Sequence, residues 1–285
     1  MDRVLLTGAT GFIGGATAAE LRGMPEISLS TPVRGPGRPD LAEPRSLAGL
    51  CDGIDVLVHA ASYVGDDARR CLVVNDQGTA ALVEQARQAG VRKIVYVSTA
   101  AVYGVGPHRG ERPDELTPAP VSPRSSTRLA AEGHVLAAGG VVVRPHLVYG
   151  KGDKWFVPSL IRLREALGGW LADDSARMSV INVVDLARLL AGLVTADVPA
   201  GTVLHANHPE PVPVGTVMDV VSAVHGIGEP ERRLSRAEAE SLVSPRHLDL
   251  ITNDHFYESE TAWRVTSLRP GPPFAQAYPG VGRRS

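Results

Sequence analysis

The glycine-rich segment TGATGFIG at residues 7–14 restricts the fold of this chain more than any other feature of its sequence. It follows RVLLT at residues 3–7, an apolar run typical of a buried strand, and it opens residues 12–22, whose spacing predicts a helix. A glycine-rich turn from a strand into a helix is typical of a dinucleotide-binding unit. The sequence therefore predicts a nicotinamide dinucleotide site at this turn.

Each glycine of this segment has a separate expected role. Gly8 allows a tight turn, Gly11 lets the main chain approach a pyrophosphate, and Gly14 lets the helix pack closely on the sheet. The N-terminus of the helix adds free N–H groups and a partial positive charge for the phosphates. The cofactor-binding residues predicted in this segment are Gly8, Thr10, Gly11, Phe12, Ile13 and Gly14.

Short apolar runs alternate with helical stretches along the first half of the chain. Near-continuous apolar strands are typical of a parallel sheet covered on both faces, and helices between them predict right-handed crossovers. The predicted fold class is α/β, with a Rossmann-type doubly wound parallel sheet in residues 1–150 as an NADP-binding domain. The predicted strands are 3–7, 27–31, 55–61, 93–99 and 141–145, and the predicted helices are 12–22, 71–89 and 123–138.

The pattern changes after about residue 150. Residues 151–285 predict a smaller, mostly helical C-terminal lobe that binds the substrate, although some of its strands are expected to return to the sheet of the first domain. The tail from residue 269 has too much proline and glycine to continue a helix. The helices predicted in this lobe are 155–168, 183–196, 214–227 and 235–250, and a short strand is predicted at 202–206.

Composition limits the partners and the compartment. A formal net charge of −2 over 285 residues gives no electrostatic reason to expect nucleic acid or a membrane surface, so a small molecule is the expected partner. Cys51 and Cys71 are isolated thiols that are expected in the core, as in a reducing cytosol. No leader and no long apolar run is evident, which predicts a soluble cytoplasmic protein. The nine histidines have no metal-ligand spacing, and no metal is expected.

Arg34 follows the second predicted strand, where the choice between the two nicotinamide cofactors is made. An NAD site has a carboxylate there for the ribose hydroxyl, whereas a 2′-phosphate needs a cation. The chain has Pro32, Val33 and Arg34 at this place and no acid. The sequence therefore favours NADP(H), with a solvated surface arginine as the alternative interpretation.

The motifs taken together resemble the extended short-chain dehydrogenase/reductase family, in an atypical form. This family includes nucleotide-sugar epimerases, dehydratases and ketoreductases. The resemblance implies that Asp40 and Leu41 lie near the adenine, and that Ala60, Ala61 and Ser62 lie beside the pyrophosphate. It also implies cofactor-side positions for Asn75 and Pro145. The motifs are TGATGFIG, HAAS at 59–62, VNDQGT at 74–79, STAAVYG at 98–104, RPHLVYG at 144–150, INVVDLA at 181–187 and ETAWRVTSL at 260–268.

The same resemblance implies a catalytic Ser or Thr, a Tyr that donates a proton to the carbonyl oxygen, and a Lys four residues after the Tyr. Thr99 matches the first position. The segment SPRSSTRLAAE at 122–132 matches the region of the other two, with Arg124 in place of the Tyr and Arg128 in place of the Lys. Arginine keeps its proton at physiological pH, so neither residue can transfer one. The usual proton relay of the family is therefore missing.

Two hypotheses explain the missing relay. One is a noncatalytic NADP-binding sensor or regulator, since a fold does not imply a function. The other is a ketoreductase that relies on alignment of hydride and carbonyl, with Arg128 on the ribose hydroxyls and Thr99 or a guanidinium near the developing charge. Arg124 then points either at the substrate or into solvent. A ketone beside a hydroxyl, as in peri-hydroxylated aromatic polyketides, would carry its own proton.

The substrate side leaves a third hypothesis, a nucleotide-sugar ketoreductase. Leu147 stands where the family usually has an Asn before VYG, and this disfavours a diphosphosugar. Several aromatic residues could instead line the site of a flat aromatic ketone. Packing in the core is the competing interpretation for each of them, and His146 is also a candidate proton source. The predicted substrate-binding residues are Tyr63, Tyr103, Arg124, His146, Trp155 and Phe156.

Overall fold

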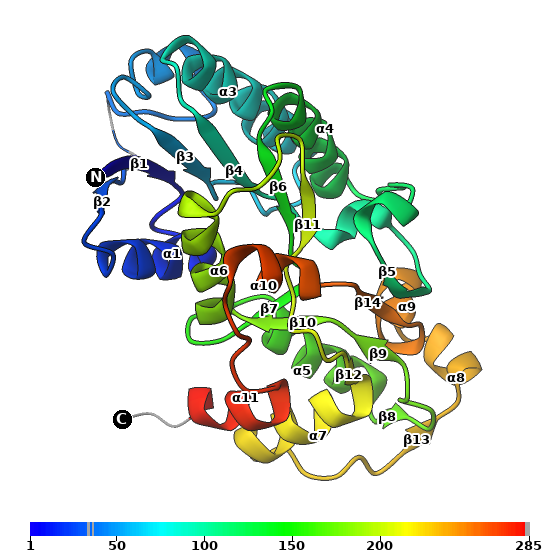
Figure 1. Cartoon of the computed structure of the whole chain (residues 1–285). Coiled ribbons are helices and arrows are strands. Elements are labelled where there is room, and N and C mark those ends of the chain that lie inside the picture. Colours follow the sequence, from blue (N-terminus) through cyan, green and yellow to red (C-terminus); the bar gives the residue numbers. More distant parts are fainter. Residues whose placement is uncertain (33–34, 36, 283–285) are drawn as a thin grey trace.

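A six-stranded parallel sheet organises the larger lobe of the computed structural model, which describes residues 1–32, 35 and 37–282 (Figure 1). The strand order is β11-β6-β4-β3-β1-β2, and every neighbouring pair is parallel. The predicted doubly wound α/β sheet is confirmed. Its strands are β1 (Asp2–Thr7), β2 (Ile27–Ser30), β3 (Val56–His59), β4 (Lys93–Val97), β6 (Val141–Arg144) and β11 (Val203–His205).

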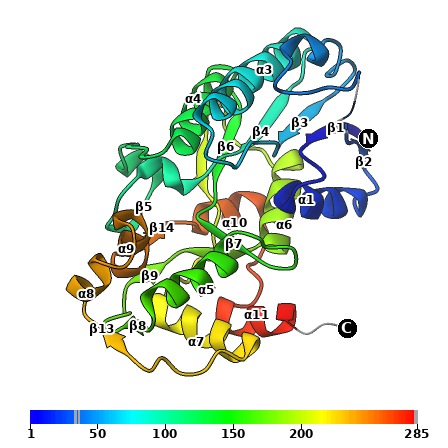
Figure 2. The ribbon, with the colours of Figure 1, turned by 180° about the vertical axis from the view of Figure 1, so that it is seen from behind.

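Helices cover both faces of this sheet because its strands are apolar on both sides. Val4 and Leu6 of β1 pack with Leu186 and the rest of one cluster, on the face of α1 (Phe12–Arg22) and α6 (Val183–Thr195). Leu5 and Leu57 belong to the opposite cluster, with side chains of α3 (Gly78–Gln88) and α4 (Pro123–Ala137). Figures 1 and 2 show α3 and α4 together on one side of the sheet.

The region from residue 68 to 88 is helical throughout but changes its winding. A π-helical segment, η2 (Cys71–Gln77), lies between the short α2 (Ala68–Arg70) and α3. Cys71 is buried in this segment, and Cys51 is buried in the core beneath α3, as the sequence predicts. Short 3-10 turns are present at η1 (Pro44–Leu47), η3 (Ala100–Tyr103) and η4 (Pro113–Glu115).

The smaller lobe contains more strand than the sequence predicts. Its helices α5, α7, α9 and α11 pack around one apolar core with several short sheets. The strands of this lobe are β5 (His108–Glu111), β7 (Leu147–Tyr149), β8 (Trp170–Leu171), β9 (Arg177–Met178), β10 (Val180–Asn182), β12 (Val212–Pro213), β13 (Arg233–Leu234) and β14 (His255–Tyr257). Its helices are α5 (Phe156–Leu167), α7 (Val214–His225), α8 (Arg236–Glu240), α9 (Pro245–Thr252) and α11 (Phe274–Gly282).

The two lobes exchange segments of the chain. β11 and α6 lie after residue 150 but belong to the large sheet and its covering layer, and α10 (Glu260–Thr266) also packs there. β5 lies before residue 150 but pairs with β14 in a four-stranded sheet of the smaller lobe, β12-β9-β14-β5. The two lobes are therefore joined by several segments of the chain.

Two expectations about the C-terminal region are wrong. The tail forms helix α11, because Phe274 and Tyr278 lie one turn apart and pack on Tyr149 and the lobe core. The helix predicted at 235–250 is divided in two, because Ser244 caps a new helix whose first residue is Pro245. Among the described residues, no helix has the length and apolar character that crossing a membrane requires.

Candidate active site

The glycine loop after β1 is fixed by close main-chain contacts. Gly8 has φ of +79°, and a side chain there would bring its Cβ to 2.6 Å from the main-chain nitrogen of Ala61. A Cβ on Gly14 would collide with the carbonyl group of Gly8. A Cβ on Gly11 would meet only Gly8 O, at 3.2 Å. Gly8 and Gly14 are thus required by the fold, whereas Gly11 has open space in front of it.

A cavity of about 210 Å³ begins at this loop. It runs along the carboxyl ends of β1 and β3, where ligands bind in open α/β sheets. Main-chain groups at the start of α1 and an apolar wall suit phosphates and an adenosine, so the cavity fits one half of a dinucleotide. Its lining residues are Thr7, Gly8, Thr10, Gly11, Pro32, Pro39, Leu41, Leu47, Leu50, Ala60, Ala61, Ser62 and Leu82.

Seven of these lining residues are among those that the sequence predicts to bind the cofactor, and the others are not. Thr7 could have been found, since it is the last residue of the first strand. Leu47 and Leu50 could not, because they come from the 3-10 turn η1 and the loop after it, which have no motif. Arg34, the predicted partner of a 2′-phosphate, lies outside the described residues. Pro32 and Pro39 on either side of it line the cavity.

Four other residues predicted to bind the cofactor do not line this cavity, and their described contacts are with other parts of the protein. Ile13 packs against the core under the sheet, and Asp40 Oδ1 accepts a hydrogen bond of 2.9 Å from Ala42 N. Pro145 O accepts a bond of 2.8 Å from Ala100 N. Asn75 is 1 % exposed, and its amide bonds to the main-chain nitrogen and oxygen of Tyr63 at 2.7 and 3.0 Å. Asn75 therefore fixes the loop that follows β3.

Phe12 is the first residue of α1, and its ring faces the turn at Gly152 in the smaller lobe. A Cβ on Gly152 would lie 3.7 Å from Phe12 Cδ2. Phe12 therefore lies where the glycine loop meets the second lobe.

Thr99 follows the carboxyl end of β4, and Arg128 bonds to the main chain just before it. Thr99 Oγ1 accepts a hydrogen bond of 3.1 Å from Ala101 N and so caps the turn η3. Arg128 Nη2 donates to the carbonyl oxygens of Val97 and Ser98, the second at 3.0 Å. Arg128 Nε is buried and has no hydrogen-bond partner among the described residues. In this structure Arg128 thus holds the end of the strand that leads into Thr99.

Arg124 lies one helical turn before Arg128 on α4 and reaches the loop after β3. Its Nη2 donates to Asp66 Oδ1 at 2.6 Å. The Asp66 side chain is 95 % exposed and that of Arg124 is 31 % exposed. Arg124 Nε is buried and unpartnered in the described part of the chain. Arg124 therefore lies at the border between the site and solvent.

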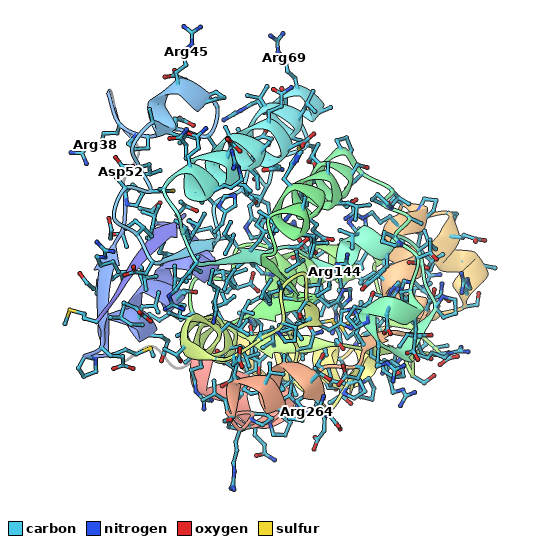
Figure 3. All side chains as sticks on the ribbon, turned by 45° about the horizontal axis from the view of Figure 1, so that its top comes forward. Arg38, Arg45, Asp52, Arg69, Arg144 and Arg264 are labelled. Carbon is cyan, nitrogen blue, oxygen red and sulfur yellow. The ribbon has the colours of Figure 1, made fainter. Side chains whose placement is uncertain are left out.

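Tyr103 packs in the core, which favours the packing interpretation over a contact with substrate. It is 2 % exposed, and its hydroxyl bonds to Arg144 Nη1 at 2.6 Å and to His205 Nε2 at 2.7 Å. Arg144 also forms a buried, two-pronged ion pair with Glu132. Figure 3 shows Arg144 inside the molecule, whereas Arg45 and Arg69 extend outward. This network joins α4 to β6 and β11.

His146 lies beside the site in a group of aromatic rings. Its ring stacks on that of His255 at 5.8 Å and meets Tyr257 edge-on at 5.4 Å. Its Nε2 is buried and lacks a partner among the residues described. Burial, with His255, His108 and His205 nearby, holds the pKa of His146 well below its usual value. The ring is neutral at pH 7, which disfavours His146 as the proton source.

The remaining aromatic candidates separate in the structure. Phe156 is 7 % exposed and belongs to the core of the smaller lobe, which favours the packing interpretation over a contact with substrate. Trp155 is 52 % exposed at the start of α5. Tyr63 packs against the core under α3, and Arg70 lies over its ring at 4.4 Å. Leu147 packs against the lobe core as well.

The described residues contain no group of three or more His, Cys, Asp or Glu side chains arranged to hold a metal ion. The site consists of the glycine loop with its cavity, Thr99 as the cap of η3, and two arginines on α4. Neither arginine can exchange a proton near neutral pH.

Comparison with known proteins identifies the family. The model of the NAD dependent epimerase/dehydratase family matches residues 4–204. The chain belongs to this family. Members and relatives of this family are NAD(P)-dependent oxidoreductases and epimerases, and the chain is an enzyme of this class.

Curated relatives include reductases. The chain is 28% identical over 266 residues to 2-alkyl-3-oxoalkanoate reductase of Stenotrophomonas maltophilia, covering 82% of this chain and 78% of the relative. It is 31% identical over 192 residues to 4-hydroxy-2-methyl-3-oxo-4-farnesyl-3,4-dihydroquinoline-1-oxide ketoreductase of Stigmatella aurantiaca, covering 61% of this chain and 55% of that relative.

Solved structures share the fold at low identity. RMD from Pseudomonas aeruginosa, complexed with NADPH, has a TM-score of 0.77 at 22% identity and covers 99% of this chain and 97% of its own. UDP-glucuronic acid 4-epimerase from Bacillus cereus, in complex with UDP-glucuronic acid and NAD, has a TM-score of 0.78 at 18% identity, with 98% of each chain covered. These likenesses confirm the Rossmann-type fold.

Proposed function

We propose that this chain is a cytoplasmic, NADPH-dependent ketoreductase that reduces a ketone of a polycyclic aromatic polyketide of angucyclinone type in antibiotic biosynthesis. In this proposal the substrate supplies the proton. The replacement of Tyr and Lys by Arg124 and Arg128 also makes the sequence resemble the angucyclinone ketoreductase of simocyclinone biosynthesis. Two curated relatives with names ending in reductase or ketoreductase support the reduction of a ketone.

The proposal rests on the described candidates for a proton donor, none of which is a usable acid. Arg124 and Arg128 are permanent cations. The hydroxyl of Tyr103 is bonded to Arg144 and His205, and burial raises its pKa further. His146 is neutral, because burial lowers its pKa. None of these residues can donate a proton to an alkoxide as a family tyrosine does.

A hydroxyl beside the ketone resolves this difficulty. Such a hydroxyl already donates a hydrogen bond to the carbonyl oxygen, which polarises the carbonyl and holds the proton where it is needed. NADPH, when bound, supplies the hydride. Gly11 and the start of α1 would hold its pyrophosphate. Thr99 is the residue that the family resemblance puts near the carbonyl oxygen. The enzyme then contributes alignment and electrostatics.

The preference for NADPH over NADH rests on the sequence around Arg34. Pro32 and Pro39 line the cavity, and the sequence between them has no acid for a free ribose hydroxyl. One similar solved structure contains NADPH and another contains NAD, so the fold is compatible with both. A charge-assisted contact with the 2′-phosphate is what we infer for Arg34.

One absorbance experiment separates the candidate functions. Purified protein is mixed with NADPH and then with a peri-hydroxylated aromatic ketone, and NADPH consumption is followed. Consumption with the aromatic ketone supports the proposal. Consumption only with a 4-keto nucleotide sugar would support the nucleotide-sugar ketoreductase, although Leu147 disfavours it. Binding of NADPH, seen in tryptophan fluorescence, without consumption by either compound would support a noncatalytic sensor.

A further inference from the structure

We propose that Arg124 binds the anionic oxygen that the substrate carries after its hydroxyl has given up a proton, and that Asp66 occupies this guanidinium until the substrate replaces it. This proposal rests on the proposed function and specifies its substrate class. The substrate would be a ketone whose neighbouring hydroxyl is acidic, such as a phenol. The features that support it are the position of Arg124, its hydrogen bonds and its neighbouring charges.

Arg124 lies beyond the carboxyl end of the sheet. Helix α4 runs antiparallel to β4, because Arg128 near its start bonds to Ser98 O after β4 while Gly140 after its end lies against Ile94. Arg124 is one turn nearer the helix start, which places it about 6 Å farther along the axis than Arg128. The loop from Ala60 to Asp66 adjoins it and also borders the cofactor cavity. The guanidinium thus lies next to the site and can reach solvent.

The hydrogen bonds of Arg124 leave room for a ligand. Asp66 takes one guanidinium nitrogen, and Nε is buried without an acceptor among the described residues. A buried donor without a partner is unfavourable, so an incoming oxygen would gain a bond that the free protein lacks. Because Asp66 is 95 % exposed, its ion pair is weakly held and easily exchanged.

The charges around Arg124 favour an anion. Arg128, one turn away, donates to neutral carbonyl oxygens and forms no ion pair with any described residue. The positive end of the α4 dipole lies at the same place, since the helix begins at Pro123. Asp66 is the carboxylate that pairs with Arg124. When Asp66 moves away, the guanidinium of Arg124 and the N-terminus of α4 are free to face an incoming anion.

The chemistry of substrate-assisted reduction places an anion there. The carbonyl carbon gains a hydride from NADPH, and the carbonyl oxygen gains the proton of the neighbouring hydroxyl. The electron pair of the broken O–H bond stays on the hydroxyl oxygen, which becomes a phenolate. A proton from water neutralises it on release. A guanidinium beside this oxygen lowers the pKa of the hydroxyl and so eases its proton transfer.

The test measures the pKa of a bound phenol without turnover. Protein saturated with NADP⁺ is mixed with 1-hydroxyanthraquinone, and the visible band of its phenolate is titrated with pH. We expect the pKa of the bound phenol to fall by about 1 to 3 pH units below that of the free compound. Arg124→Gln should abolish most of this shift, and Arg124→Lys should keep part of it. Arg87→Gln, which removes an exposed arginine of α3 that pairs with Glu84, should keep it all.

Asp66→Asn gives an independent arm of the test. It removes the competing carboxylate, so the phenolate form of 1-hydroxyanthraquinone should bind up to about fivefold more tightly. The affinity for 1-methoxyanthraquinone should not change. Equal phenol pKa values in the parent and Arg124→Gln would overturn the proposal, and so would equal gains for both probes. Consumption of NADPH by the hydroxyketone would then still stand. Failure of the proposed function is a separate result, in which neither probe binds and no NADPH is consumed.

Discussion

Arg128 Nη2 donates to Ser98 O at 3.0 Å, and the same nitrogen donates to the carbonyl of Val97. These bonds fix the main chain immediately before Thr99. Both bonds come from one nitrogen, so the ammonium group of the lysine that the family resemblance implies here has enough donors to replace them. In this chain the cation therefore has a structural task at the end of β4.

Restoring the implied family residues tests whether the arginines are replacements without function. The double variant Arg124→Tyr with Arg128→Lys should bring no large gain in kcat, because the substrate already supplies the proton. The lysine ammonium has three donors and can make both carbonyl bonds, so the stability to urea should change little. Steady-state rates with an aromatic hydroxyketone measure the first effect. A rate increase of a hundredfold or more, the order expected of a restored acid, would show that the enzyme lacks only its donor.

Gly11 and Gly14 should respond differently to substitution. Gly11→Val should abolish cofactor binding and leave a folded protein, because its Cβ would meet only Gly8 O inside the protein while its branches fill the cavity. Gly14→Val should lower the thermal unfolding temperature strongly, since its Cβ collides with the main chain of Gly8. Circular dichroism and fluorescence titration with NADPH separate the two effects. Retained NADPH binding in Gly11→Val would mean that the loop is only a turn.

Arg34→Ala tests the cofactor preference. Loss of charge-assisted bonds to a 2′-phosphate should weaken NADPH binding by about 1.5 to 3 kcal/mol, or roughly ten- to a hundredfold in Kd. NADH has no 2′-phosphate, and its Kd should change little. Titration of both cofactors against both proteins gives the comparison. Equal weakening of NADH and NADPH rejects the assignment of Arg34.

His59 predicts how stability depends on pH. Its ring is bonded to Thr7 and Thr79 at 2.6 and 2.9 Å, and burial, together with the charge of Arg128, lowers its pKa to about 3. The unfolded chain takes up this proton below about pH 6.5, so stability falls as the pH decreases from there toward 3. Between about pH 7.5 and 5 the loss should reach about 2 kcal/mol. His59→Gln should show a smaller loss in urea denaturation, and an identical loss would contradict the neutral ring.

The larger lobe can be predicted from the sequence, because its strands are apolar on both faces and its helices α1 and α4 begin after a glycine loop and at a Ser-Pro pair. Helix α1 has the predicted bounds at Phe12–Arg22, and Ser122 caps α4 as its Ser-Pro pair indicates. The smaller lobe was less readable. Several of its strands have only two or three residues, as β9 and β12 do, and depend on pairing with distant segments.

The site could be predicted to the level of its motifs. The motifs predict that the glycine loop and HAAS lie at the cofactor site, and both line the cavity. Leu47 and Leu50 line it too, but they come from a turn and a loop that have no sequence signal. Tyr103 and Phe156 look from the sequence like binding residues because an aromatic ring serves packing and recognition equally well. Only the tertiary contacts separate these roles, as the bonds of Tyr103 to Arg144 and His205 illustrate.

A change in the substrate tests most directly whether its hydroxyl supplies the proton. The aromatic hydroxyketone and its O-methyl ether are compared in steady-state kinetics at saturating NADPH, with cofactor affinity measured for each. If the substrate supplies the proton, methylation depresses kcat strongly, on the order of 10²-fold or more, at unchanged affinity for NADPH. Reduction of the methyl ether at the rate of the parent ketone would contradict substrate assistance.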